Sequence, residues 1–146
     1  MVDELEITIA SHPRWLRPLR QAVQEFVREV GFSGRQIQSI TLAVDEAVGN
    51  VIKHAYEGRE DGELTVKLHA DDGGVEVRIC DCGAPFDPTA EEPPPPEELR
   101  PGGRGLFLIR EIMDDVQYGR ENGANVFRMS KRLPSASEEP ELRHGN

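Results

Sequence analysis

The sequence has few cysteines, few aromatic residues and no long apolar run. Its 146 residues include two cysteines, and aromatic residues make up 5% of the chain. Cys80 and Cys82 are too few for a closed zinc site and wrongly spaced for a disulfide framework. No stretch approaches the roughly 18 apolar residues that a membrane span requires. These absences argue against a metal-stapled, a disulfide-rich or a membrane-spanning protein.

A recognisable secretory signal is also lacking. The segment from Met1 to Glu6 has neither a basic start nor an apolar stretch, whereas a signal peptide needs both. We therefore expect a cytoplasmic protein with no membrane contact.

Positive charge is scarce. The chain has 17 Lys and Arg residues against 27 Asp and Glu residues, a formal net charge of −10. Residues 87–101 and 134–146 carry six of the ten excess negative charges, so the remaining body is mildly acidic and has no basic stripe. Because nucleic-acid binding depends on neutralising phosphates, we exclude a direct nucleic-acid partner. A single nucleotide in a local pocket remains possible.

The hydrophobic pattern predicts one α+β domain over residues 1–133. Apolar residues spaced three and four apart predict helices over residues 15–30, 33–58 and 105–113, with Gly31 and Gly58 ending the first two. Alternating apolar and polar residues predict short strands near residues 5–9, 64–68, 75–79, 116–118 and 126–129. This order predicts a two-layer α/β sandwich, in which helices cover one face of a mixed, mostly antiparallel sheet.

Two segments have no periodicity. Residues 87–101 contain the run Pro93 to Pro96, and a loop of this length in a compact domain is either functional or disordered. We expect a mobile lid there and a disordered acidic tail at residues 134–146.

The second predicted helix carries a second stripe. Glu46, Asn50 and His54 lie on one side of it, about 120° from the middle of the apolar stripe. An asparagine oxygen can bind Mg²⁺, and a glutamate can accept a proton from a hydroxyl group. The alternative is an ordinary solvated helix face that includes Lys53, with His54 as a structural histidine. Asp45 is expected to be a plain surface charge.

Two further motifs favour a nucleotide. Asp81 ends a predicted strand and Gly83 follows two residues later, so the carboxylate can face a pocket and accept a hydrogen bond from an exocyclic amine. The stretch Gly103-Arg104-Gly105 leads into a helix, whose free N–H groups can bind phosphate. Each motif alone is equally compatible with an ordinary turn or hinge. Together with the Glu46–Asn50 stripe and the intervening loop, they predict a nucleotide site with a closing lid.

These residues also resemble a known family. The segment Thr41–Tyr56 resembles the glutamate–asparagine helix of the GHKL (histidine-kinase-like) ATPase superfamily, and more closely that of the serine-protein-kinase anti-sigma factors of bacterial stress and sporulation control. Asp81–Phe86 looks like the adenine motif of that family, and Gly102–Ile109 looks like its glycine-rich lid end. The resemblance extends over about residues 5–133.

The resemblance implies roles for individual residues. Asn50 would coordinate a Mg²⁺ ion that bridges the ATP phosphates, and Glu46 would deprotonate an attacking serine hydroxyl. Lys53 and Arg104 would lie within reach of phosphate. In the nucleotide pocket, Asp81 would bind the adenine amine, Gly83 would give it room, and Gly103 and Gly105 would leave backbone amides free for the phosphates.

The resemblance also implies partners. Family members form homodimers, bind a sigma factor and phosphorylate a small anti-sigma-factor antagonist. Two features depart from the family pattern: the lid is acidic with four consecutive prolines, and Ala124-Asn125 stands where many relatives have Gly-Thr. Asn125 can still offer a hydrogen bond.

The leading hypothesis is therefore an ATP-dependent serine protein kinase and anti-sigma factor. The first alternative is a nucleotide-gated protein-binding module without useful kinase activity, in which ATP orders the lid. The second is a detached ATPase domain that phosphorylates a histidine on another protein.

Overall fold

The computed structural model describes residues 3–87 and 105–134. The predicted lid at 87–101, apart from Asp87, lies outside the described residues, as do Gly103 and Arg104. The same holds for the predicted tail at 134–146, apart from Pro134.

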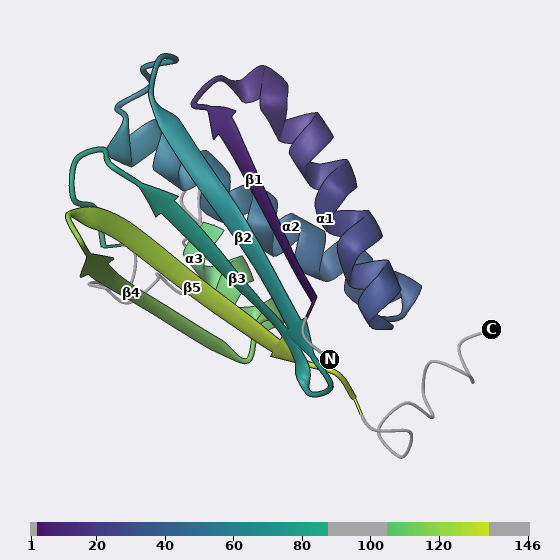
Figure 1. Ribbon diagram of the computed structural model, residues 1–146. Coiled ribbons are helices and arrows are strands. Elements are labelled where there is room, and N and C mark those ends of the chain that lie inside the picture. Colours follow the sequence, from purple (N-terminus) through teal and green to yellow (C-terminus); the bar gives the residue numbers. More distant parts are fainter. Residues whose placement is uncertain (1–2, 88–104, 135–146) are drawn as a thin grey trace.

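A five-stranded sheet forms one layer of the molecule (Figure 1). Its strands are β1 (Asp3–Ala10), β2 (Glu63–Asp71), β3 (Gly74–Asp81), β4 (Asp115–Glu121) and β5 (Ala124–Arg132). They are arranged in the order β1-β2-β3-β5-β4, and all four pairings are antiparallel. Every predicted strand is present, and the expectation of a mostly antiparallel sheet is confirmed.

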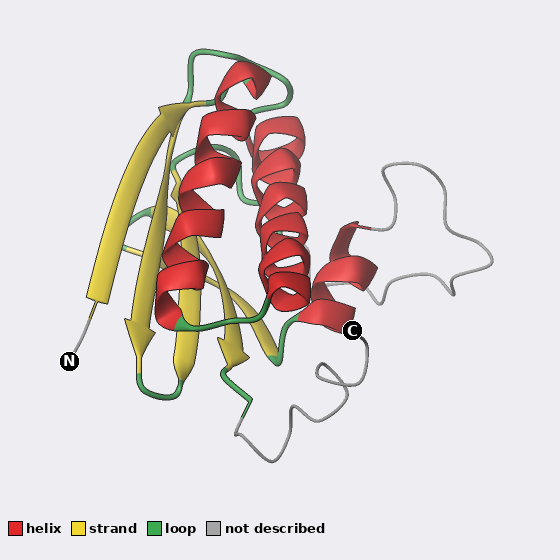
Figure 2. Cartoon of the chain, turned by 90° about the vertical axis from the view of Figure 1, so that its right-hand side faces the viewer, coloured by secondary structure: helices red, strands yellow, loops and turns green. Residues whose placement is uncertain are grey.

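Helices form the second layer and cover one face of this sheet (Figure 2). They are α1 (Leu16–Val30), α2 (Gly34–Asn50) and α3 (Gly105–Ile112), with a short 3-10 turn at Pro13–Trp15 before α1. No helix among residues 3–87 and 105–134 is long and apolar enough to cross a membrane. The predicted two-layer α+β architecture is confirmed.

The connection between α1 and α2 shows why these helices end and begin where they do. Gly31 caps α1 in the left-handed conformation at φ 116°, which a glycine adopts without steric cost. Ser33 then caps α2: its hydroxyl accepts the Gln36 N–H, and the Gln36 side chain accepts the Ser33 N–H. This reciprocal pair satisfies two backbone donors at the start of the helix.

The core lies between the two layers, where the strand periodicity meets the helix periodicity. Val66 on β2 and Val77 on β3 are fully buried, and so are Val23 on α1 and Val48 on α2. Their polar neighbours on the strands face the opposite side of the sheet, because successive side chains of a strand alternate between its faces.

One ion pair joins the two long helices. Arg20 on α1 donates to Asp45 Oδ1 on α2 from both Nε and Nη2, at 3.3 Å and 3.0 Å. Both side chains are partly exposed. Asp45 is therefore a helix–helix contact rather than the plain surface charge that we expected.

The second helix changes its winding before it ends. The α-helical part stops at Asn50 and a π-helical turn, η2 (Val51–Ala55), follows, with the Tyr56 N–H donating to the Val51 carbonyl at 3.1 Å. The expected end at Gly58 is close, since Gly58 has φ 80° and donates to the Ile52 carbonyl. The expectation of one uniform helix to Gly58 was wrong in its last turn.

Tyr56 ties the end of this turn to the sheet. Its side chain is 4% exposed, its hydroxyl donates to the Glu63 carbonyl, and the Cys82 N–H donates to the same hydroxyl at 3.2 Å. Burial raises the pKa of the Tyr56 hydroxyl. The hydroxyl thus holds the end of β3 against the turn that follows α2.

Candidate functional site

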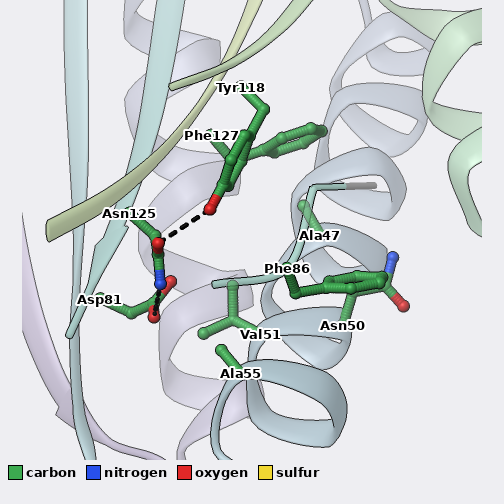
Figure 3. Close-up of a pocket in the computed structure, with 9 residues that line it drawn as sticks. All are labelled: Ala47, Asn50, Val51, Ala55, Asp81, Phe86, Tyr118, Asn125 and Phe127. Atoms are coloured by element: carbon green, nitrogen blue, oxygen red, sulfur yellow. Dashed lines mark hydrogen bonds between the residues drawn. The ribbon is translucent and has the colours of Figure 1, made fainter. Parts of the chain in front are cut away.

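A cavity lies where the end of α2 and its π-helical turn meet strands β3, β4 and β5 (Figure 3). Its wall is mainly apolar, but three strand side chains, Asp81, Tyr118 and Asn125, and Asn50 from α2 bring polar groups to it. The lining residues are Ala47, Asn50, Val51, Ala55, Asp81, Phe86, Tyr118, Asn125 and Phe127. Its volume is about 20 Å³, which is room for a single water molecule.

Asp81 is the carboxylate of this cavity. It is the last residue of β3 and its side chain is 5% exposed. Its Oδ1 atom accepts the Gly83 N–H at 2.9 Å and the Asn125 side-chain amide at 2.9 Å. Within the described residues no hydrogen bond ends on Oδ2, so this oxygen remains available to a donor from a ligand.

Asn125 on β5 is the polar residue whose importance the sequence left open. It is 2% exposed, and its Nδ2 atom reaches Asp81 Oδ1 and also the Gly83 and Ala84 carbonyls at 3.2 Å and 3.3 Å. Its Oδ1 atom accepts the Tyr118 hydroxyl at 2.8 Å and a guanidinium N–H of Arg120. The alternating pattern that predicts the last hairpin does not predict this hydrogen-bond network.

Gly83 holds the loop after β3 against the end of α2. The Ala84 N–H donates to the Ala55 carbonyl at 2.8 Å. A Cβ atom on Gly83 would lie 2.5 Å from the Ala55 oxygen and 2.8 Å from its carbonyl carbon, which is closer than atoms can approach. The structure therefore gives a packing reason for glycine here, in addition to the room for a ligand that the family resemblance implies.

Glu46 and Asn50 meet at the first residue of α3. A Cβ atom on Gly105 would lie 3.0 Å from Glu46 Oε2, 3.3 Å from Asn50 Nδ2 and 3.7 Å from Asn50 Oδ1. The tips of both side chains therefore lie at the N-terminus of α3, where the backbone amides carry partial positive charge. Three of the predicted site residues are brought together in this way.

Lys53 and His54 lie on the π-helical turn and are exposed. Neither is among the residues that line the cavity. The His54 ring stacks on Phe86, with centroids 4.4 Å apart and planes 29° apart. Burial lowers the pKa of His54, and the positive charge of Lys53 lowers it further. His54 therefore borders the site as a neutral side chain at pH 7.

The cavity fits a purine nucleotide in its chemistry. Asn50 and Asp81 line the same cavity, and Asn50 also lies against Gly105, so the first residue of α3 and the carboxylate at the end of β3 are linked through Asn50. Among the described residues, no group of three or more His, Cys, Asp or Glu side chains is suited to hold a metal ion. A lone amide oxygen on Asn50 suits Mg²⁺, which commonly keeps several waters and binds through one or two protein ligands plus phosphates.

Comparisons with known proteins identify the family. The family model for the histidine kinase-like ATPase domain matches residues 9–131. The serine-protein kinase RsbW of Listeria innocua is 36% identical over 134 residues, covering 86% of this chain and 85% of that protein. The serine-protein kinase RsbW of Oceanobacillus iheyensis is 33% identical over 148 residues, covering 96% and 92%.

Two solved structures share the fold. One contains the RsbU and RsbW domains of a Mycobacterium tuberculosis protein; the match has a TM-score of 0.65 at 22% identity, over 90% of this chain and 32% of that one. The other is the histidine kinase domain of a blue-light activated histidine kinase from Erythrobacter litoralis, with a TM-score of 0.52 at 17% identity, over 86% and 62%. The chain belongs to the histidine kinase-like ATPase domain family.

Proposed function

We propose that this chain is an ATP-dependent serine protein kinase and anti-sigma factor that acts in the cytoplasm. The observation that carries the proposal is the meeting of Glu46 and Asn50 at Gly105, because Asn50 also lines the cavity that holds the carboxylate of Asp81. The printed names of the relatives, serine-protein kinase, support the same reaction.

In this proposal one part of the site binds the adenine base and another binds the phosphates. Asp81 accepts a hydrogen bond from the exocyclic amine of adenine through Oδ2, and the apolar wall encloses the ring. Gly105, with Gly103, lets the phosphate oxygens approach the backbone amides at the start of α3. Lys53 and Arg104 contribute positive charge near the phosphates.

Glu46 is the proposed general base. It accepts the proton of a substrate serine hydroxyl, while the serine oxygen forms a bond to the γ-phosphorus and the bond from that phosphorus to the bridging oxygen of ADP breaks. Asn50 would hold Mg²⁺ through its side-chain oxygen. The bound cation would neutralise charge on the phosphate oxygens during transfer. Glu46 and Asn50 must therefore face the same phosphate, as their shared contact point at Gly105 permits.

The family resemblance supports the partners that we propose for this kinase. The substrate serine belongs to a small anti-sigma-factor antagonist, the sequestered partner is a sigma factor, and the working form is a homodimer. Sedimentation of the full chain with and without ATP tests the dimer directly: a single species at monomer mass at micromolar concentration would contradict it.

Transfer of phosphate from radiolabelled ATP to a candidate antagonist tests the reaction. We expect wild-type protein to label the antagonist, and Glu46→Gln to lose at least about a hundredfold in rate while binding ATP normally. Asp45→Asn is the matched control, because Asp45 is the neighbouring carboxylate but pairs with Arg20. Equal loss in both variants would argue against Glu46 as the base.

The stability of the product in acid tests the acceptor. Phosphoserine survives acid and phosphohistidine does not, so an acid-labile product would instead favour a histidine-phosphorylating ATPase domain. If ATP binds but no antagonist becomes labelled, the chain is a nucleotide-gated binding module.

A further inference from the structure

Asn125 uses every hydrogen-bonding group of its side chain inside the protein. Its two amide hydrogens face three acceptors, Asp81 Oδ1 and the Gly83 and Ala84 carbonyls. Its oxygen accepts from Tyr118 (Figure 3) and also from Arg120. Although Asn125 lines the cavity, it therefore has no group left for a ligand, and any effect on a ligand must pass through its neighbours.

The orientation of the Asn125 amide is forced by these neighbours. If the amide were turned over, its NH₂ group would face the Tyr118 hydroxyl and the Arg120 guanidinium, and its oxygen would face a carboxylate and two carbonyls. The Tyr118 hydroxyl can turn to accept an N–H, but the Arg120 guanidinium and the three oxygen acceptors cannot adapt, and each buried group left without a partner costs about 1–3 kcal/mol. Arg120 in particular has no acceptor to offer, so Nδ2 must face Asp81.

We propose that Asn125 is a positioning residue that sets the preference of the site for a 6-amino purine. Together with the Gly83 N–H, the Asn125 amide fixes Asp81 Oδ1 on the protein side. The carboxylate plane is then set, and Oδ2 is left as an acceptor for the cavity. A fixed acceptor attracts the amine at position 6 of adenine and repels the oxygen at the same position of hypoxanthine or guanine.

This inference rests on the proposed nucleotide site and deepens it. Without Asn125 the Asp81 carboxylate keeps one anchoring hydrogen bond, from Gly83, and gains freedom to turn about its terminal torsion, which is intrinsically broad. A mobile carboxylate can turn away from a 6-oxo base. Loss of Asn125 should therefore reduce the preference for a 6-amino over a 6-oxo purine. A simple packing defect would instead weaken the binding of all nucleotides by the same factor.

The test compares the dissociation constants of ATP and inosine triphosphate by calorimetry on the full chain with Mg²⁺. We expect wild-type protein to prefer ATP, and Asn125→Ala to lower that preference about tenfold, the factor for one hydrogen bond to a charged group. Arg120→Met removes one donor to the Asn125 oxygen from outside the cavity, and Tyr118→Phe removes the other from the cavity wall; both should lower the preference by a smaller factor. Arg128→Met is the matched control, because Arg128 pairs with Glu121 outside this network.

The outcomes separate the two proposals. If wild-type protein binds neither triphosphate, the proposed nucleotide site is wrong and the role of Asn125 falls with it. If wild-type protein prefers ATP and Asn125→Ala weakens both nucleotides by the same factor, the site stands and the positioning role is overturned. If Asn125→Ala does not fold, as judged by circular dichroism, an unchanged preference in both Tyr118→Phe and Arg120→Met overturns it.

Discussion

His54 shows how a single residue reports on the wall of the site. Its ring stacks on Phe86, which itself lines the cavity, and Lys53 precedes it on the π-helical turn. Both burial and the adjacent ammonium disfavour the protonated imidazole, which is why the pKa of His54 is lowered. The charge state of His54 is therefore sensitive to whether Phe86 stays in place.

Titration of the His54 ring protons by NMR should give a pKa below 6.5, the ordinary value for histidine. Phe86→Ala should raise this pKa because it exposes the ring, and Lys53→Met should raise it by removing a like charge. Because the unfolded chain binds the proton at a higher pH than the folded chain, stability is complete above pH 6.5 and falls as the pH drops toward the folded pKa. A measured pKa at or above 6.5 would contradict this account.

At the scale of elements, the end of α2 explains what a sequence can and cannot reveal. The Glu46–Asn50 spacing and the apolar stripe predict the helix and the face on which Glu46 and Asn50 lie. They do not reveal the π-helical turn at Val51–Ala55, because its apolar residues continue the same spacing. The last carbonyls of a helix have no partner within it, and the Ala55 carbonyl finds one across the chain, in the Ala84 N–H.

For the strands too, the sequence predicts some features and not others. The alternation near Asp81 predicts where β3 ends and that its carboxylate can face a pocket, since both depend on local pattern. Nothing local predicts that Asn125 reaches Asp81, because the two residues are 44 positions apart. Their meeting requires the register in which Asp81 lies opposite Asn125. Sequence therefore predicts which residues can act, and long-range pairing decides which of them meet.

The contact between the β3 loop and the π-helical turn leads to a prediction for two glycines. Gly83→Ala should cost about 1–3 kcal/mol of unfolding free energy, since the new methyl group would meet the Ala55 carbonyl at 2.5 Å. Gly49→Ala should instead stabilise the protein by about 0.5–1 kcal/mol, because Gly49 lies in α2 and its Cβ would meet nothing within 4 Å.

Denaturation with urea measures both glycine variants in one experiment. The two substitutions add the same methyl group to neighbouring parts of the molecule, so only the surroundings differ between them. Two changes of equal sign and size would contradict the proposed packing role of Gly83.

At the scale of the whole molecule, the site lies where the two layers meet. Asn50 comes from the helical layer and Asp81 from the sheet, and the cavity between them has a volume of about 20 Å³. A purine is larger than the single water that this space admits. Full enclosure of a purine at the proposed site therefore requires part of the wall to move, and Phe86 is the lining residue on the loop that follows β3.

A ligand that joins both layers should raise the stability of the whole domain. At an ATP concentration 100 times the dissociation constant, binding adds about 2.7 kcal/mol, which for a chain of this size raises the melting temperature by about 5 to 10 °C. Asp81→Asn should lose most of this rise because it weakens the sheet side of the site. Glu46→Gln should keep the rise, since Glu46 acts on the substrate hydroxyl and not on the nucleotide base.

Calorimetric melting with and without Mg²⁺ and ATP decides between these expectations. A full rise in Asp81→Asn would place the purine elsewhere, and a lost rise in Glu46→Gln would make Glu46 a binding residue.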